Sequence, residues 1–461
     1  GSWLKMGHGQ RFDLNVRGGS EDLTYYLSSG YTTETGNVEA PRGGLEAFNL
    51  RANFQFEGLE DFTVRFNAAY NRQDIEWLPN GDNWEGLLRN VATLYEDETG
   101  NQDALVFEKD EDQFINHFNF SGNLNWVPMD NFRHRLNVGI DWSNSHFITF
   151  RPWGYFNDPE GTRTVDIEDQ RVTTLDYASS FSSGIPGLSS DFTSVLSAGG
   201  QFTAVERLGN RTDVRGFIGL GNKVLENAEE PTNYNEDYDG RKQGGFFVQE
   251  QLGWKNRAFL TAGFRADSHS HFGEDREHDY FLQIYPKLQA TYTLSDHNWW
   301  PSFWETSRLR VAYGESGEPP PPGESLIYFQ VSSLADENEL GFIVQNQGNL
   351  ELGPELTREL EVGLDGSFLL GKVNYTLTGY RRNTEEGLIP LSPAASNGIA
   401  ESLYLNIGEW ESEGIETALD VLAYDGFDVQ VSLNGRYQWN ETKFTKLTTG
   451  QEYQDNLNYN Q

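Results

Sequence analysis

Apolar and polar side chains alternate strictly along several segments of about ten residues, the length that a tilted strand needs to cross a membrane. Every second residue is apolar between residues 48 and 56, and again between 62 and 70 after the short connection 57–61. The same period returns at residues 132–142 and 427–439. Successive side chains of a strand point to opposite faces, so this period gives each strand one apolar and one polar face. The pattern predicts antiparallel strands joined as hairpins.

Short and long connections alternate along the whole chain. The short connections are expected near residues 17–22, 57–61, 127–131, 207–210, 255–257, 370–372 and 425–426. The long, polar connections are expected at residues 73–113, 151–190, 225–241, 268–282, 315–354 and 387–401. A membrane-spanning β-barrel has short periplasmic turns and long extracellular loops, whereas a soluble sandwich needs no such rhythm. Roughly eight hairpins, and hence about 16 strands, follow from this count.

The composition suits such a barrel. Aromatic residues make up 14% of the 461 residues, although the hydrophobic fraction is only 37% and the mean hydropathy is −0.62. A barrel strand shows lipid only every second side chain, so its average hydropathy stays low. No stretch approaches the roughly 20 unbroken apolar residues of a spanning helix. Aromatic residues flank the short turns and indicate an interfacial girdle, as in Phe56 and Phe62, Trp126 and Phe132, and Trp254 and Phe259.

Charge and cysteine content exclude several function classes. The chain has 34 basic and 70 acidic residues, a net charge of −36, and nucleic acid is therefore not an expected partner, because phosphate binding needs clustered Lys and Arg. The absence of cysteine excludes disulfide frameworks and thiolate chemistry. No Gly-x-Ser-x-Gly elbow, His-Glu-x-x-His motif or phosphate-binding glycine loop occurs in a supporting context. The chain is expected not to be an enzyme and to hold no cofactor.

Acidic clusters at residues 108–112 and 235–240 offer oxygen ligands that suit calcium, although neither has the spacing of an EF-hand. The alternative is that they are solvated charges of exposed loops. His269, His271 and His278 lie among acidic residues in a predicted long loop, where solvent-exposed histidines are the simpler interpretation. No metal ligand is assigned, and calcium in an extracellular loop stays an open alternative.

Aromatic residues at the starts of the predicted long loops are candidates for substrate binding. An aromatic face can stack on a sugar ring or another flat ligand. The alternative is packing within the loop. Trp299, Trp300 and Trp304 fall instead in an unusually wide short-side connection, where a girdle is expected. The candidate substrate-binding residues are Trp77, Trp84, Trp153 and Tyr155.

Several motifs in series resemble the barrel of SusC-like TonB-linked transporters. The order of the motifs along the chain makes the resemblance specific, because each one alone is short. It departs from the family at Glu318, which is followed by four prolines at 319–322. The matching segments are Arg-Gly-Gly-Ser-Glu at 17–21, Phe-Val-Gln-Glu at 247–250, Gly-Trp-Lys-Asn-Arg at 253–257, Thr-Ala-Gly-Phe-Arg-Ala-Asp at 261–267, Leu-Arg-Val-Ala-Tyr-Gly at 309–314, Leu-Gly-Pro-Glu at 352–355, Glu-Leu-Glu-Val-Gly-Leu-Asp at 359–365, Asn-Ile-Gly at 406–408 and Glu-Gly-Ile-Glu at 413–416.

The resemblance implies an all-β fold, a large antiparallel transmembrane β-barrel. Residues 1–461 would form one partial barrel, about 16 of the family's 22 strands, with the plug domain absent from this sequence. It further implies the bacterial outer membrane as location and TonB-dependent import of a nutrient, a glycan or peptide oligomer. The expected partners are a SusD-like surface lipoprotein, the TonB–ExbB–ExbD energy-coupling complex and outer-membrane lipid.

Two other functions stay open at this point. One is a soluble or surface-exposed all-β carbohydrate-binding module, whose apolar faces would pair inward. The other is a structural barrel that has lost transport. The transported substrate is carried by loop sequences, in which a single chain shows no pattern.

Overall fold

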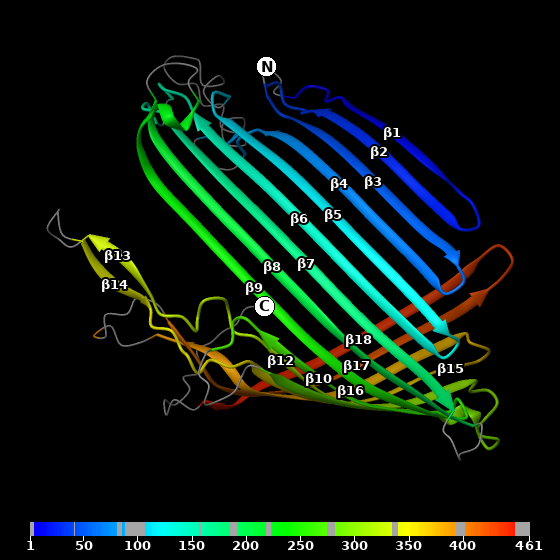
Figure 1. Cartoon of the computed structure of the whole chain (residues 1–461). Helices are drawn as coiled ribbons and strands as arrows, with labels where there is room; N and C mark the ends of the chain where they lie inside the picture. Colours follow the sequence, from blue (N-terminus) through cyan, green and yellow to red (C-terminus); the bar gives the residue numbers. More distant parts are fainter. Residues whose placement is uncertain are drawn as a thin grey trace. The chain divides into compact units, whose positions relative to one another are not determined.

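The computed structural model describes residues 4–40, 42–80, 85–87, 107–155, 158–184, 191–217, 223–273, 282–333, 340–392, 396 and 402–447. In this part of the chain, sixteen strands form one antiparallel sheet and two more form a separate hairpin (Figure 1). The expected all-β fold with about 16 strands is confirmed. The strands are β1 (Gly9–Gly19), β2 (Leu23–Thr35), β3 (Gly44–Leu59), β4 (Phe62–Trp77), β5 (Asp110–Met129), β6 (Phe132–Arg151), β7 (Thr162–Gly184), β8 (Phe192–Phe217), β9 (Ala228–Trp254), β10 (Ala258–His269), β11 (Gln283–Thr293), β12 (Thr306–Glu318), β13 (Tyr328–Ser333), β14 (Leu340–Asn346), β15 (Glu355–Phe368), β16 (Val373–Leu391), β17 (Leu403–Asp425) and β18 (Gln430–Leu447).

Neighbouring strands in the sheet are neighbours in the chain, except that β12 pairs with β15 because the β13–β14 hairpin lies in the connection between them. The chain divides into two compact units. The first unit comprises residues 1–129, 134–177 and 202–242, and the second comprises 130–133, 178–201 and 243–461. Within the first unit, β1 to β6 lie side by side in chain order (Figure 1).

Short and long connections alternate as the sequence predicts. One end of each hairpin closes over two to four residues at 20–22, 60–61, 130–131, 255–257, 369–372 and 426–429, and over wider connections at 185–191 and 294–305. We call this the turn end of the strands and the opposite one the loop end. The wide connection with Trp299, Trp300 and Trp304 lies at the turn end, as expected.

Three predicted connections are wrong. Residues 207–210 lie inside β8, most of the predicted loop 151–190 is β7, and most of the predicted loop 225–241 belongs to β9. In β7 and β9 the apolar alternation covers only the half nearest the turn end. The other half is mostly polar and has few apolar residues, such as Val165 and Ile167 in β7, so the period of two is too short to recognise although the backbone remains extended.

The apolar face of β4 shows why the alternation stops. Phe62, Val64, Phe66, Ala68 and Tyr70 share one face over roughly 27 Å of strand. The next two positions on this face are Arg72 and Asp74, whose Nη2 and Oδ2 atoms pair at 2.9 Å. An apolar band of about 25 Å is the height of a membrane-spanning barrel surface. The strand therefore continues past the band into a polar environment.

Four rings form a row on the apolar face near the turn ends of β4, β5, β6 and β7. Phe62 stacks on Trp126 at 5.6 Å between ring centroids, and Trp126 stacks on His134 at 4.8 Å. His134 stacks in turn on Tyr177 at 6.1 Å, and its Nδ1 lies 2.8 Å from the Tyr177 hydroxyl. Such a row is the interfacial girdle that the aromatic residues beside the short turns predict.

The two faces should respond oppositely to a new charge. Leu50→Arg places a cation on the apolar face of β3, and we expect it to lower the free energy of unfolding by about 2–4 kcal/mol. Asn49→Arg, one residue away on the polar face, should change it by less than about 0.5 kcal/mol. Urea titration of the protein refolded in lipid vesicles, followed by heat-modifiable gel mobility, measures both values. Equal effects of the two substitutions would contradict the face assignment.

Candidate functional site

A buried ion cluster centred on Glu85 holds the loop ends of the first unit together. Arg151, the last residue of β6, donates from Nε and Nη2 to the two Glu85 carboxylate oxygens, each at 2.8 Å. Lys109 Nζ lies 2.9 Å from Glu85 Oε2 and 2.6 Å from Glu111 Oε1. Burial by itself raises the pKa of the Glu85 carboxyl, but hydrogen bonds from Arg151 and Lys109 outweigh it and lower that pKa to about 2. Glu85 therefore stays ionised at neutral pH.

Asp110, the first residue of β5, forms a second buried ion cluster next to the first. Its carboxylate accepts from Arg42, in the connection between β2 and β3, and from Lys223, in the connection between β8 and β9. Arg42 also pairs with Asp112. The Lys223 ammonium lies 5.5 Å from the centroid of the Phe150 ring. Five segments distant in sequence are thus connected at this end of the unit.

A small apolar core supports the two ion clusters. Phe150, Val214 and Phe217 are buried and contact one another, with Leu225 and Ala228 packed against them. The Phe150 and Phe217 rings meet edge to face, with 5.3 Å between their centroids and 84° between their planes. Edge-to-face contact of this kind is the preferred geometry of aromatic pairs. The loop end is therefore a folded layer with its own core, which we call the loop-end layer.

The connection 152–161 is fixed to this layer by backbone hydrogen bonds. Gly154 N donates to Pro159 O at 2.8 Å, and Phe217 N donates to Glu160 O at 2.8 Å. Gly161 has φ 74°, and a Cβ there would lie 2.9 Å from the backbone nitrogen of Trp153. Only glycine fits this position without strain.

The four predicted substrate-binding residues differ in how exposed they are in the structure. Trp153, in the connection 152–161, is 53% exposed, and Trp77, the last residue of β4, is 45% exposed. Trp77 Nε1 donates to Gln113 Oε1 at 3.0 Å. Tyr155 is 0% exposed, and burial together with nearby Glu85 raises the pKa of its hydroxyl. Trp84 lies outside the described residues. Ligand contact stays a prediction for all four.

The ion clusters were missed at the level of sequence. Glu85 and Arg151 are 66 residues apart, and no local pattern marks one as the partner of the other. The sequence makes the acidic cluster 108–112 a candidate calcium site. In the structure, Asp110, Glu111 and Asp112 pair with Arg42, Lys109 or Lys223. Within the described residues, no group of three or more His, Asp or Glu side chains is arranged to hold a metal ion.

The structure also describes part of the other two candidate metal sites, residues 235–240 and the histidines between 269 and 278. Residues 235–240 lie within β9 and are largely exposed. His269 and His271 are buried, with 4.7 Å between their ring centroids, so they are not the exposed loop histidines that were expected. His278 and its acidic neighbours lie outside the described residues. Calcium binding stays a prediction.

The polar face of the first unit is rich in amide groups. Asn123 Nδ2 donates to Asn137 Oδ1, and Asn125 Nδ2 donates to Asn123 Oδ1 at 2.7 Å. Asn67 Nδ2 donates to Ser121 Oγ at 3.2 Å. An amide carries both donors and an acceptor, so this face can hydrogen-bond an uncharged polar chain in either sense.

The polar face of the second unit carries ion pairs instead. Arg310 binds both carboxylate oxygens of Asp365 at 2.6 and 3.0 Å and reaches Glu361 Oε1 at 2.9 Å. Close by, a polar recess of about 500 Å³ lies between β16, β17 and β18. Glu416 and Arg436 line it, and neither has an ion-pair partner within the described residues. This face offers fixed charges of both signs.

Among the described residues, no helix has the length and apolar character required to cross a membrane.

Comparison with known proteins identifies the family. The family model described as TonB dependent receptor-like, beta-barrel matches residues 2–460. The chain is similar to TonB-dependent receptor P26 of Formosa agariphila, with 24% identity over 442 residues, covering 88% of this chain and 43% of that protein. It is also similar to TonB-dependent receptor SusC of Bacteroides thetaiotaomicron, with 25% identity over 95% of this chain and 47% of that protein. The chain thus spans less than half the length of these relatives.

Solved structures agree on the fold. The structure described as the RagAB peptide transporter matches with a TM-score of 0.81 and 17% identity, covering 96% of this chain and 52% of that chain. The Escherichia coli outer membrane transporter YddB matches with a TM-score of 0.57 and 10% identity, covering 95% of this chain and 55% of that chain. The resemblance in the sequence is therefore confirmed, and the chain belongs to the SusC-like, TonB-dependent receptor β-barrel family of the outer membrane.

Proposed function

We propose that this chain is the barrel of a TonB-dependent importer that carries a nutrient oligomer across the outer membrane. The observation that carries the proposal is the family match over residues 2–460, joined to a sheet with one apolar and one polar face. A polar face suits a hydrated pathway, and an apolar face suits lipid. We propose transport without chemical change of the substrate.

For the substrate we propose a glycan or peptide oligomer, with a peptide favoured. The structural neighbour RagAB is described as a peptide transporter, which supports a peptide. The amide groups of the first unit and the fixed charges of the second can bind a peptide's main chain and its charged ends. The exposed indoles of Trp77 and Trp153 can stack on a flat side chain or a sugar ring.

As partners we propose a SusD-like surface lipoprotein and the TonB–ExbB–ExbD complex of the inner membrane. The similarity to a SusC receptor supports the first, and the family supports the second. A large barrel of this family encloses a lumen that must be gated, so we propose that import through it draws on an energy source at the membrane. We further propose that Trp77 and Trp153 meet the substrate before it enters the lumen.

Deletion of the gene in its native host tests the transport function. We expect growth on one class of oligomer, tested with peptides and glycans as sole carbon source, to be lost and to return with the wild-type gene. A protonophore should abolish uptake of the labelled oligomer. Unchanged growth on every oligomer of both classes would overturn the proposed function.

Trp153→Ala tests the proposed contact with substrate. We expect about fivefold weaker binding of the oligomer identified by the growth assay, because a stacked aromatic contact is lost. Isothermal titration of the detergent-purified protein measures the dissociation constant. Trp299→Ala is the matched control, since Trp299 is also highly exposed but lies at the turn end. Binding that is unchanged in Trp153→Ala, or weakened equally in both variants, would remove Trp153 from the site.

Glu85→Gln tests whether the ion cluster holds the loop-end layer. Removing one partner of a buried pair costs on the order of 3 kcal/mol, which corresponds to about 100-fold faster amide hydrogen exchange. We expect this acceleration at the amides of Gly154 and Tyr155, measured by mass spectrometry at neutral pH. Glu160→Gln is the control, because Glu160 is largely exposed and its contact with Arg215 is 3.9 Å.

The same cluster predicts an acid dependence. The folded-state pKa of Glu85 is about 2, below the ordinary value of 4.5, so its contribution to stability is complete above pH 4.5 and is lost as the pH falls toward 2. Exchange at Gly154 and Tyr155, corrected for the intrinsic rate, should therefore accelerate between these pH values in the wild type. Acceleration of the same size in Glu85→Gln would contradict this assignment.

A further inference from the structure

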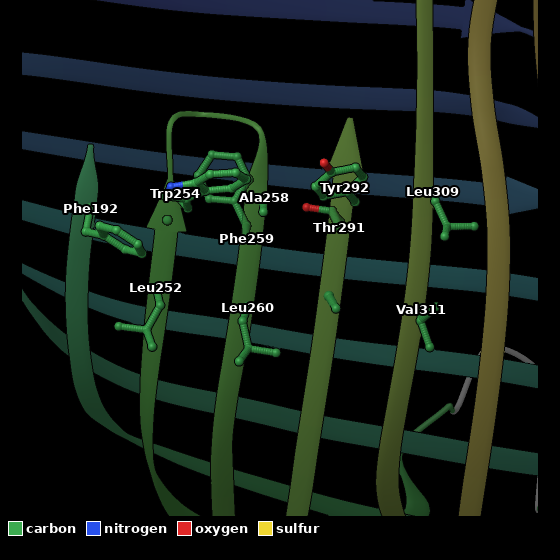
Figure 2. Close-up of a pocket in the computed structure, with 12 residues that line it drawn as sticks. Phe192, Leu252, Trp254, Ala258, Phe259, Leu260, Thr291, Tyr292, Leu309 and Val311 are labelled. Carbon is green, nitrogen blue, oxygen red and sulfur yellow. The ribbon is translucent and has the colours of Figure 1, made fainter. Parts of the chain in front are cut away.

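The apolar face of the second unit is hollowed near the turn ends of β8 to β12. The groove has a volume of about 430 Å³ (Figure 2). Figure 2 shows Trp254, Ala258 and Tyr292 near the turn, with Leu252, Leu260 and Val311 farther along their strands. All of these residues belong to the second unit. With Phe192 of β8 also among its lining residues, the groove lies across five neighbouring strands beside the β9–β10 turn.

The register of the strands explains the groove. Leu252, Leu260, Ala290 and Val311 are paired in succession and form one row across β9 to β12. Trp254, Ala258, Tyr292 and Leu309 form the next row toward the turn. Each row has one alanine among large side chains. The surface is therefore low at Ala258 and Ala290 and high around them, which gives a channel with aromatic and aliphatic walls.

A basic turn stands at the end of this groove. Lys255 and Asn256 occupy the two central positions of the β9–β10 turn with φ of 53° and 52°, the conformation of a type I′ hairpin. Arg257 follows at once. The chain has a net charge of −36, and most of its other tight turns carry acids, as at Glu21, Asp22, Glu60, Asp61 and Asp130, whereas the turn 369–372 carries Lys372. Among the tight turns of the described residues, the β9–β10 turn is the one with two basic residues.

Both basic side chains of this turn pair with partly exposed carboxylates, and an anion can compete with these. Lys255 is exposed, and its Nζ forms an ion pair with Asp191 Oδ2 at 3.5 Å and lies 5.5 Å from the Trp254 ring centroid. Arg257 Nη2 donates to the Asp296 carbonyl at 2.8 Å, and its Nε lies 3.8 Å from Asp296 Oδ2. The two nearest carboxylates, of Asp191 and Asp296, are about half exposed, so solvent screens them.

We propose that this groove binds a glycerophospholipid of net negative charge, with an acyl chain over Ala258 and Ala290 and its phosphate at Lys255 and Arg257. The apolar face of an outer-membrane barrel is continuous with the lipid, so an acyl chain reaches the groove without leaving the bilayer. Tryptophan and tyrosine rings mark the headgroup level, where the basic turn lies. Basic residues at that level attract anionic lipid.

A second apolar groove gives a control within the same chain. It has a volume of about 490 Å³ and lies in the first unit, along β1 to β5, with Leu50, Ala52, Ala68 and Tyr70 among its lining residues. It too owes its depth to alanines between larger residues. The turns of its strands are acidic, at Glu21 and Asp22, Glu60 and Asp61, and Asp130. An acyl chain fits both grooves, but an anionic headgroup is favoured only beside Lys255.

Native mass spectrometry of the delipidated protein in mild detergent tests the proposal, with phosphatidylglycerol and phosphatidylcholine as probes. We expect phosphatidylglycerol to bind more tightly than phosphatidylcholine. Lys255→Gln should weaken the binding of phosphatidylglycerol about fivefold, as expected for loss of one cation near an anionic headgroup, and should leave phosphatidylcholine unchanged. Lys255→Arg should retain the preference. Ala290→Leu, which fills the groove, should weaken both lipids.

Ala52→Leu is the matched control for Ala290→Leu, because it fills a groove on strands that end in acidic turns and has no basic turn beside it. It should leave the preference for phosphatidylglycerol intact. Heat-modifiable gel mobility shows that each variant is folded before it is compared. Equal affinity of the wild type for the two lipids, or equal effects of Ala52→Leu and Ala290→Leu, would overturn the proposal. Growth on the nutrient oligomer reports on transport separately, so failure of the lipid site and failure of the importer are distinguishable.

Discussion

The pairing of backbone amides between neighbouring strands is the constraint on which the rest of the structure depends. Hydrocarbon offers no hydrogen-bond partner, so a chain that crosses it as strands must satisfy its N–H and C=O groups through its neighbours. Neighbouring strands in the chain are neighbours in the sheet, apart from the β13–β14 hairpin, which is set outside it. Because the backbone groups are paired between strands, apolar and polar side chains can take opposite faces of the sheet. The alternation of Leu50 and Asn49 follows from this division.

Beyond the apolar band, different interactions hold the chain. The strands β7, β8 and β9 continue for many residues past the point where lipid could cover them. Their polar halves gain little from hydrophobic burial, and the loop-end layer is stabilised by buried ion pairs, backbone hydrogen bonds and the small core of Phe150, Val214 and Phe217. A buried ion pair adds little net stability, but each partner fixes the other's position. Glu85 thereby links Lys109 and Arg151, which come from distant parts of the chain.

The sequence predicts the fold wherever the two faces of a strand differ. It finds β3, β4, β6 and β18 by their period, and it places a short turn at residues 255–257. It fails at β7 and β9, where half of each strand is mostly polar and has the composition of a loop. It also fails at residues 207–210, which resemble a turn but lie within β8. The residue composition of a strand indicates whether its faces meet lipid or water, but it does not indicate how long the strand is.

The candidate site also has a part that the sequence predicts and a part that it does not. An exposed Trp153 could be anticipated because an aromatic residue at the start of a polar loop is unusual. The ion cluster that holds the loop-end layer could not be anticipated. Glu85 is one of many acidic residues, and nothing near it in sequence indicates that Arg151 and Lys109 will surround it. The glycine at 161 is more informative in retrospect, since its φ of 74° allows the connection to turn beneath Trp153. The register of the sheet decides which distant residues form ion pairs, and this register cannot be read from a single sequence.

The two faces of the sheet also separate two kinds of ligand. The polar face presents amides in one unit and fixed charges in the other, and it meets a solute that passes through water. The apolar face suits lipid, and alanines lower its surface in places. A groove alone would select a lipid only by chain shape. The combination of Ala258 and Ala290 with Lys255 and Arg257 adds selection by headgroup, because no other tight turn of the described residues carries two basic residues.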